Sequence, residues 1–312
     1  MKKKRLLGML LTAVVAVGVL AGCGKTAETA DKKSEVITIT DRNGEVEVPK
    51  NPEKVVVLDY GSLDILDEIG VESVVGVPKS NLPEYLGEFK DDKYTDIGGV
   101  KEFNFETINE LAPDLIIIEG RQADSLEELS KIAPTIYLGS TGSDYLNSIK
   151  NNADVLGKIF DKEKEVAEKL STIDTRVNEI KSKVTENNLN ALAAMVTDGS
   201  MSVYGAGSRY NILFNELGFE PTDNSLEVSN HGQSISYEYL AEKNPDYLFV
   251  IDKGAVTGKG NPAKNTVENE LVKTTDTFKN GNIVYVDSVA WYVGGAGFKA
   301  LDKMLDDVEN AL

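Results

Sequence analysis

Two stretches of this chain follow one pattern: FETINELAPDLIII at residues 105–118 and YEYLAEKNPDYLFVI at residues 237–251. In each stretch a glutamate stands seven residues before a Pro-Asp pair, and a short apolar run follows that pair. The segment before Pro-Asp is typical of a helix, the pair itself of a tight turn, and the apolar run of a buried parallel strand. The repeat therefore predicts two α/β halves built from the same helix–turn–strand unit.

A cation follows each repeated unit at the same distance. Arg121 stands seven residues after the aspartate of the first Pro-Asp pair, and Lys253 stands seven residues after that of the second. Both residues therefore come just past the carboxyl end of a predicted strand, which is the edge where open α/β sheets bind ligands. We expect Arg121 and Lys253 to face a ligand cleft between the two halves.

Other apolar runs complete the two predicted lobes, which we bound at residues 36–142 and 187–312. The expected fold class is α/β, with two Rossmann-like lobes, parallel sheets and a single long α-helix joining them. A closing helix is expected over residues 299–312, because Leu301, Met304, Leu305 and Val308 recur on one helical face. The remaining candidate strands are residues 55–58, 74–77, 135–138, 192–196 and 283–286.

Residues 143–186 form the helical segment between the lobes. A run from Lys162 to Glu186 carries one apolar stripe and would span roughly 37 Å, long enough to act as a stiff connecting rod. A coiled-coil dimer seam is the alternative, although the stripe is too short for several full heptads. We expect a monomer. The stripe consists of Val166, Leu170, Ile173, Val177, Ile180 and Val184.

The N-terminus predicts export and a lipid anchor. A basic stretch at residues 2–5 precedes an apolar run at residues 6–20, which is too short for an ordinary membrane-spanning helix. The run ends in LAGC, which resembles a bacterial lipobox and contains Cys23, the only cysteine of the chain. We expect a lipoprotein signal peptide over residues 1–22, and an acylated Cys23 with a flexible tether over residues 23–35. A plain signal peptide or a buried cysteine is the alternative.

The charge of the chain restricts its partners. The sequence has 33 Lys and Arg against 51 Asp and Glu, a formal net charge of −18. A chain this acidic repels nucleic acid, and no basic stripe interrupts the acidic composition. We therefore expect no nucleic-acid partner.

Five short motifs resemble a known family: EGRQ at 119–122, GSRY at 207–210, HGQSISYE at 231–238, DKG at 252–254 and AWY at 290–292. They are similar to motifs of the petrobactin and catecholate siderophore-binding lipoproteins, which belong to the helical-backbone class of substrate-binding proteins for iron-siderophore and cobalamin importers. The resemblance runs from about Val36 to the end of the chain. It implies capture of an anionic ferric siderophore at the extracytoplasmic face of the cell membrane and delivery to an ABC permease.

The chemistry of such a ligand calls for convergent cations. Ferric catecholate and citrate-type complexes are bulky anions, which an acidic protein holds only where cations meet in a cleft with low-dielectric walls. Arg121, Arg209 and Lys253 are the candidates, and arginine suits flat oxygen arrays because its guanidinium donates in parallel. Members of the family commonly have arginine where this chain has Lys253. The lysine keeps the positive charge but lacks the parallel N–H donors of a guanidinium.

Five further residues are candidates for the ligand cleft. Lys79 follows a predicted strand end and would add a fourth cation, and Tyr60 would stack on the ligand. We expect Trp291 and Tyr292 in a loop that lines the cleft. His231 and Tyr292 would coordinate iron only where the siderophore leaves positions open. A surface, packing or loop role is the alternative for each. We expect no intrinsic cofactor, with Fe3+ bound only as a siderophore complex.

Glu106 and Glu238 occupy equivalent places in the repeat, each at a predicted helix start. The helix dipole stabilises a carboxylate at such a position, which alone would explain both residues. The resemblance implies a second role, in which each glutamate pairs with an arginine of the importer's permease.

Three other functions are weighed against this interpretation. Cobalamin or haem binding in the same transporter class is the nearest, but neither ligand calls for three convergent cations. A zinc or manganese carrier would need several His or Cys ligands, and the chain has one of each. An enzyme on a similar scaffold is less favoured, because the sequence contains no Gly-x-Ser-x-Gly or Walker-type phosphate loop.

Overall fold

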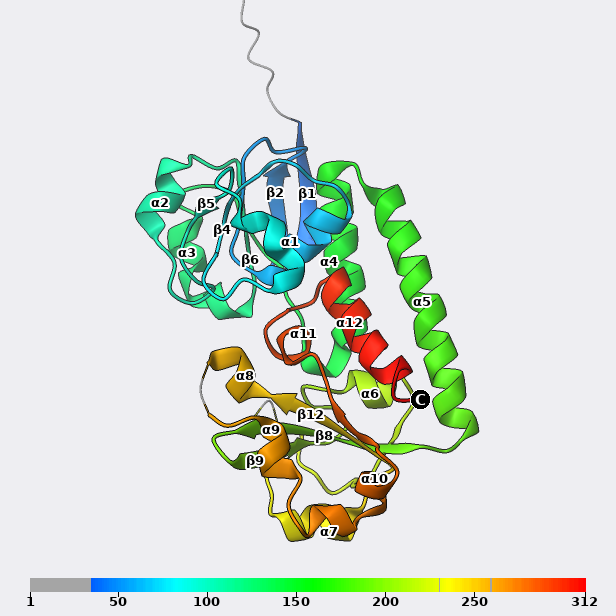
Figure 1. The fold of residues 1–312 in the computed structure, drawn as a ribbon. Coiled ribbons are helices and arrows are strands. Elements are labelled where there is room, and N and C mark those ends of the chain that lie inside the picture. Colours follow the sequence, from blue (N-terminus) through cyan, green and yellow to red (C-terminus); the bar gives the residue numbers. More distant parts are fainter. Residues whose placement is uncertain (1–34, 230, 259) are drawn as a thin grey trace, which may run out of the picture. The chain divides into compact units, whose positions relative to one another are not determined.

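The computed structural model describes residues 35–229, 231–258 and 260–312, which form two α/β lobes joined by a long helix (Figure 1). The expected signal peptide, Cys23 and all of the expected tether except Glu35 lie outside the described residues. Among the described residues, no helix is both long and apolar enough to cross a membrane.

The first lobe is built on a parallel sheet with strand order β5-β4-β3-β6-β7. The predicted strands are confirmed, and their apolar side chains are almost completely buried because helices cover the sheet. An antiparallel hairpin of β1 and β2 precedes the sheet. The bounds are β1 Val36–Asp41, β2 Gly44–Pro49, β3 Val55–Val57, β4 Val74–Val77, β5 Thr95–Asp96, β6 Leu115–Ile118 and β7 Thr135–Tyr137, with α1 Tyr60–Glu68, η1 Glu84–Lys90, α2 Phe105–Glu110, η2 Gly120–Ser125, α3 Leu126–Leu129 and η3 Gly142–Asp144.

The sheet of the second lobe is mixed, so the expectation of two parallel sheets is wrong for this lobe. Its order is β11-β9-β8-β12-β13, with β10 beside β8. Strands β10, β12 and β13 run parallel to β8, whereas β9 is antiparallel to it. Asp198 and Gly199 join β8 to β9 with φ values of 47° and 76°, the geometry that folds a strand straight back on itself.

The second lobe carries mostly short helices. Its strands are β8 Asn190–Thr197, β9 Ser200–Tyr204, β10 Glu220–Pro221, β11 Gln233–Ser234, β12 Tyr247–Asp252 and β13 Ile283–Tyr285. Its helices are α6 Ile212–Asn215, α7 Tyr237–Lys243, α8 Lys253–Thr257, α9 Ala263–Val267, η4 Val272–Thr274, α10 Asp276–Lys279 and α11 Ser288–Tyr292.

The aspartates of the two repeated Pro-Asp pairs have the same role in both lobes: each accepts a hydrogen bond from the backbone at the start of a neighbouring strand. Asp114 precedes β6, and its carboxylate accepts hydrogen bonds from the backbone amides of Glu53 and Lys54 just before β3. Asp246 precedes β12, and its carboxylate accepts one from the amide of Asn190 at the start of β8. Each aspartate therefore satisfies amides at the amino edge of the neighbouring strand and sets the strands in register.

Helices α4 (Tyr145–Phe160) and α5 (Glu163–Glu186) form the segment between the lobes. The predicted long helix is confirmed as α5, whose 24 residues span about 36 Å. Its apolar stripe is buried against α4 and α12 of the same chain, with only Leu170 partly exposed. The stripe is therefore covered within the chain.

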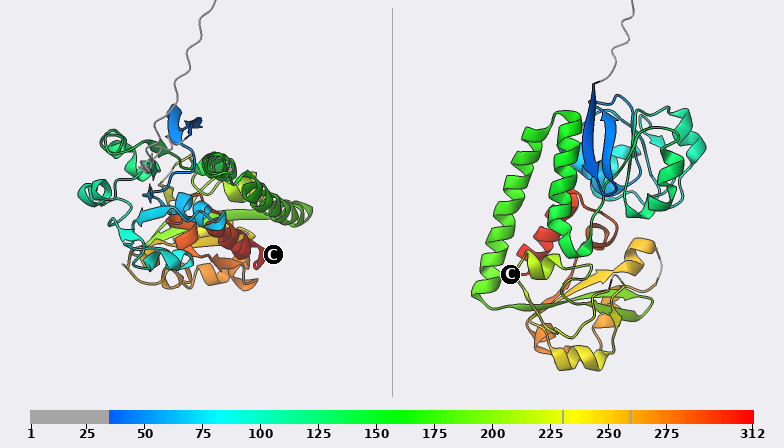
Figure 2. Two further views of the ribbon diagram at one scale, coloured as in Figure 1. Left: turned by 90° about the horizontal axis from the view of Figure 1, so that it is seen from above. Right: turned by 180° about the vertical axis from the view of Figure 1, so that it is seen from behind.

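The closing helix is confirmed as α12 (Phe298–Glu309), with all four predicted core residues buried. It packs against α11 of the second lobe, to which the predicted bounds assign it. It also lies against α1 of the first lobe and against α5 (Figures 1 and 2). Arg176 of α5 fixes one face of α12 through ion pairs to Asp302, Asp306 and Glu309 at 2.6–2.8 Å.

Candidate ligand-binding cleft

Two adjoining cavities lie between the lobes. The first has a volume of about 800 Å³ and contains Lys253, so we call it the Lys253 cavity. The second has a volume of about 770 Å³ and contains Arg42, so we call it the Arg42 cavity. Lys101, Arg121, Arg209 and Tyr292 line both. These four shared residues therefore stand at the junction of one extended cleft.

The carboxyl ends of the strands bring the predicted site residues together. Arg121 lies in η2 directly after β6, Lys253 begins α8 directly after β12, and Tyr60 begins α1 after β3. Arg209 comes from the loop between β9 and α6. Six of the eight predicted ligand-binding residues line the Lys253 cavity: Tyr60, Arg121, Arg209, His231, Lys253 and Tyr292.

Arg209 is held by contacts from both lobes. Its Nη2 donates a hydrogen bond of 2.7 Å to the backbone oxygen of Tyr292. On the first lobe, Gly142 leaves room for the Arg209 backbone, since a Cβ at residue 142 would lie 2.5 Å from the Arg209 Cα. Asn211 donates a hydrogen bond of 2.9 Å to the backbone oxygen of Ser143 beside this contact. The Arg209 backbone therefore lies where the two lobes meet, and Tyr292 holds its guanidinium.

Tyr292 lies between two cations. The guanidinium carbon of Arg209 is 4.7 Å from the centre of the Tyr292 ring, and the Lys253 ammonium is 5.7 Å from it. Both distances are within the range of cation–π attraction. The ring therefore holds two like charges near each other and reduces the cost of their repulsion.

A buried glutamine fixes the turn that carries Arg121. The Gln122 side chain is 1% exposed, donates to the backbone oxygens of Leu58 and Val100, and accepts from the Glu119 amide. Glu119 in turn forms an ion pair of 2.7 Å with Arg121. Nearby, burial and then the Glu119 charge raise the pKa of the Asp59 carboxyl to about 6. This side of the cleft is thus preorganised, and Arg121 has a carboxylate partner there.

The other cleft cations have no such partner. Within residues 35–229, 231–258 and 260–312, no carboxylate forms an ion pair with Arg42, Lys101, Arg209 or Lys253. The chain contains 51 acidic residues, so this local excess of positive charge is set against the composition of the whole protein. Such an arrangement attracts an anion into the cleft.

Two predicted site residues do not line the Lys253 cavity. The Lys79 ammonium donates hydrogen bonds of 3.2 and 2.9 Å to the backbone oxygens of Lys90 and Asp91, where η1 ends, and Lys79 lines neither cavity. Trp291 lies in α11, so the expected loop is wrong. Its indole is 4% exposed, lines the Arg42 cavity, and donates to Asp307 of α12 at 2.8 Å.

Two more predicted residues have contacts that limit their roles. The Tyr60 hydroxyl donates a hydrogen bond of 2.6 Å to the backbone oxygen of Ser80, and burial raises its pKa to about 12. His231 is exposed, and its backbone amide donates to the Ser229 hydroxyl at 3.1 Å. Among the described residues, no group of three or more His, Cys, Asp and Glu side chains could hold a metal ion.

The cleft also contains residues that the sequence did not single out. Met195 and Tyr204 both line the Lys253 cavity. The Tyr204 hydroxyl lies 3.7 Å from the Met195 sulfur. Lys101 lies in the loop before α2, and Arg42 lies in the turn between β1 and β2. Met195 lies near the carboxyl end of β8, and this position could have predicted that it lines the cleft. Nothing in the sequence around Arg42 relates it to the repeat.

The two predicted docking glutamates lie at equivalent places in the structure. Glu106 is in the first turn of α2, and Glu238 is in the first turn of α7. Both side chains are exposed. Hydrogen bonds from its own backbone amide and from Ser236 lower the pKa of Glu238. The repeat thus presents one exposed glutamate on each lobe.

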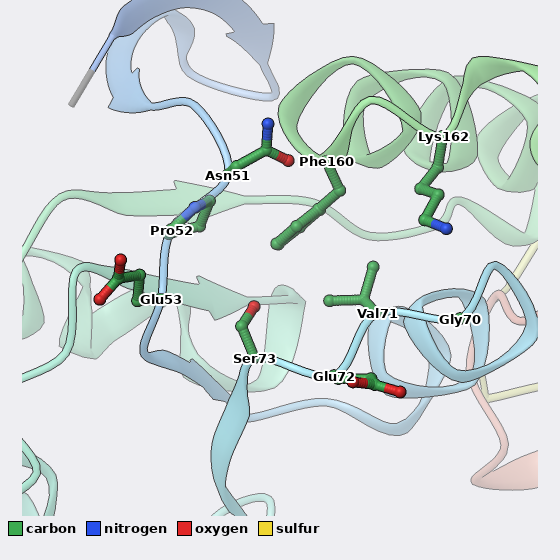
Figure 3. Close-up of a pocket in the computed structure, with 9 residues that line it drawn as sticks. All are labelled: Asn51, Pro52, Glu53, Gly70, Val71, Glu72, Ser73, Phe160 and Lys162. Carbon is green, nitrogen blue, oxygen red and sulfur yellow. The ribbon is translucent and has the colours of Figure 1, made fainter.

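A separate pocket of about 340 Å³ lies on the first lobe (Figure 3). Its walls include residues 51–53, just before β3, and residues 70–73, just before β4. It therefore lies at the amino edge of the parallel sheet, opposite the edge where such sheets bind ligands. We assign no ligand to this pocket.

Comparison with known proteins agrees with this architecture. The petrobactin-binding protein YclQ of Bacillus subtilis (strain 168) is 45% identical over 311 residues, which cover 97% of this chain and 98% of that protein. The crystal structure of YclQ has a TM-score of 0.86 at 46% identity and covers 89% of this chain and 98% of that chain.

Two other solved structures are similar. The periplasmic catecholate-siderophore binding protein VctP from Vibrio cholerae has a TM-score of 0.83 at 37% identity, covering 88% of this chain and 100% of that chain. The siderophore binding protein BauB, solved with a complex between two molecules of acinetobactin and ferric iron, has a TM-score of 0.81 at 34% identity, covering 89% and 98%. A family model described as periplasmic binding protein matches residues 55–290 of this sequence. The chain belongs to the periplasmic binding protein family.

Proposed function

We propose that this protein binds an anionic ferric siderophore, of catecholate or petrobactin type, and delivers it to an ABC permease for iron import. The observation that carries the proposal is the convergence of Arg121, Arg209 and Lys253 in the cleft of an otherwise acidic protein. Among the described residues, only Arg121 of these three has a carboxylate partner. The printed functions of YclQ and VctP, which bind petrobactin and a catecholate siderophore, support the same class of ligand.

The geometry of the cleft suits such a ligand. Arg121 comes from the first lobe, and Arg209 and Lys253 come from the second, so an anion between the lobes would meet positive charge from both sides. Guanidinium groups donate parallel hydrogen bonds to flat arrays of oxygen atoms. Tyr204, Tyr292 and Met195 add apolar surface that lowers the local dielectric and strengthens these attractions.

Iron is cargo in this proposal. The protein has no intrinsic cofactor, and Fe3+ enters only as a siderophore complex. A siderophore with six donor atoms would leave no place for a protein ligand. One with fewer donors would leave positions that His231 and Tyr292, which both line the Lys253 cavity, would fill.

The rest of the proposed function concerns the membrane. We propose that Cys23 is acylated and tethers a monomer to the extracytoplasmic face of the cell membrane. Glu106 and Glu238 would each pair with an arginine of the permease, one lobe per permease subunit, because both are exposed acidic side chains at equivalent places in the two lobes. The protein itself would catalyse no reaction.

Native mass spectrometry of the purified protein tests the ligand class. The panel consists of petrobactin and a catecholate siderophore, each with and without iron, together with cobalamin and haem. We expect one ferric siderophore per chain and much weaker retention of the iron-free compounds. Cobalamin or haem binding is the second candidate, and retention of either one without any ferric siderophore would overturn the proposal.

A further inference from the structure

Arg42 reaches the ligand-binding edge of the first sheet from the turn between β1 and β2. Its backbone amide donates a hydrogen bond of 3.1 Å to the oxygen of Tyr137, the last residue of β7. Its Nη1 donates to the backbone oxygen of Ser140 at 3.3 Å, and its guanidinium carbon is 5.6 Å from the Tyr137 ring centre. These contacts hold the side chain at the rim of the Arg42 cavity.

The cations of the cleft follow one another from cavity to cavity. Arg121 and Arg209 line both cavities, Lys253 lines only the first, and Arg42 lines only the second. A guanidinium has five N–H donors, and the side chain of Arg42 donates only one hydrogen bond within the described residues. Arg42 is also exposed and forms no ion pair within the described part of the chain. It therefore has donors available for an anion.

The size of the cleft points to an extended ligand. Each cavity alone has the volume of an ordinary small-molecule site, about 770–800 Å³. A compact anion at Arg121 and Arg209 would leave one of the two cavities unused. A ligand with two separated anionic parts would fill both.

We propose that the Arg42 cavity is a second anion-binding compartment, and that the protein selects ferric complexes with two separated anionic parts. One part would lie near Lys253 and the other near Arg42, with Arg121 and Arg209 contacting both. This inference rests on the proposed function and deepens it, because it makes Arg42 a residue that determines specificity. The opposing explanation is that Arg42 only fastens the β1–β2 hairpin to Tyr137 and Ser140.

Four variants test the compartment, with ferric petrobactin as the probe in isothermal titration calorimetry. Arg42→Gln removes the positive charge, and Arg42→Lys keeps the charge but removes the parallel N–H donors of the guanidinium. Thr141→Glu adds a carboxylate to the exposed wall of the Arg42 cavity, where the Thr141 side chain makes no capping hydrogen bond. Thr141→Gln is its uncharged match. Lys131→Gln is the control for net charge, since Lys131 pairs with Glu127 and Glu128 on the surface.

We expect Arg42→Gln and Thr141→Glu to weaken binding about tenfold or more, the scale of one lost or opposed charged hydrogen bond. Arg42→Lys should lose less, and Thr141→Gln and Lys131→Gln should bind like wild type. Thermal melting checks that each variant is folded. If Arg42→Gln does not fold, the affinity of Thr141→Glu alone tests the second compartment. Wild-type affinity in both Arg42→Gln and Thr141→Glu would overturn the compartment and leave the proposed function intact. Failure of the wild-type protein to bind any ferric siderophore would overturn both.

Discussion

At the scale of single residues, the cleft depends on Arg121, Arg209 and Lys253, of which Arg209 and Lys253 have no carboxylate partner among the described residues. Replacing Arg121 or Arg209 with alanine should weaken ferric siderophore binding by about 1–3 kcal/mol, because a charged hydrogen bond is lost in each case. Lys253→Arg should tighten binding, since it restores a forked donor. Titration calorimetry measures both effects. Normal affinity in both alanine variants would remove these cations from the site.

Tyr292 offers a test of two different roles. If its ring only separates Arg209 from Lys253, Tyr292→Phe should keep most of the affinity, whereas Tyr292→Leu should lose it, because leucine offers no face to the cations. If its phenolate coordinates iron, Tyr292→Phe should already weaken binding and shift the visible charge-transfer band of the ferric complex. We expect the first outcome for a six-donor siderophore. A band shift in Tyr292→Phe with such a ligand would contradict it.

At the scale of elements, α12 begins without a side-chain cap of its own. Its N-cap residue is Gly297, and the carboxylate of Asp64 from α1 takes over this function by accepting from the amides of Lys299 and Ala300 at 3.0 Å. A Cβ at residue 297 would lie 2.2 Å from the Asp64 carboxylate, so this contact requires glycine. The start of α12 is therefore joined to the first lobe by a buried carboxyl group.

This carboxyl group predicts a pH dependence of stability. Burial raises the pKa of Asp64 from 3.8 to about 7 in the folded protein. The folded state then retains a proton that the unfolded state releases, so the stabilisation is complete below about pH 4 and is lost as the pH rises to about 7. Within this window the slope reaches at most about 1.4 kcal/mol per pH unit.

Urea denaturation of wild type and Asp64→Asn between pH 4 and 8 measures this contribution. We expect the unfolding free energy of wild type, relative to that of Asp64→Asn, to fall across the window, since the amide does not titrate. Parallel pH profiles of the two proteins would show that Asp64 does not keep its proton at neutral pH.

At the scale of the whole molecule, the two lobes present Glu106 and Glu238 for docking. Converting both to arginine should leave siderophore affinity in solution unchanged and abolish iron uptake by cells, because both permease contacts would become repulsive. The control converts Glu127 and Glu242, which are also exposed and lie one in each lobe, to arginine. If the Glu106/Glu238 variant supports iron uptake at the wild-type rate, these glutamates do not dock to the permease and only stabilise the starts of their helices.

Local pattern was enough to predict much of this molecule. The Pro-Asp repeat predicted the two lobes, because a buried strand needs an apolar run and a tight turn needs particular residues, and both are visible in the sequence. The stripe of α5 predicted its bounds within one residue. Position after a strand predicted that Arg121 and Lys253 would share one cavity, since parallel strands end at one edge.

Only the tertiary structure decided the contacts between distant segments. Arg42 enters the cleft because the β1–β2 turn hydrogen-bonds to the end of β7. Helix α12 joins the two lobes, because Asp64 of the first lobe completes its first turn and Trp291 of the second lobe donates to its Asp307. Lys79 turned away from the cleft because backbone oxygens at the end of η1 satisfy its ammonium. Periodicity reports which face of an element is buried, but it carries no information about which remote donor or acceptor will meet that element, because those partnerships form only when the chain closes on itself.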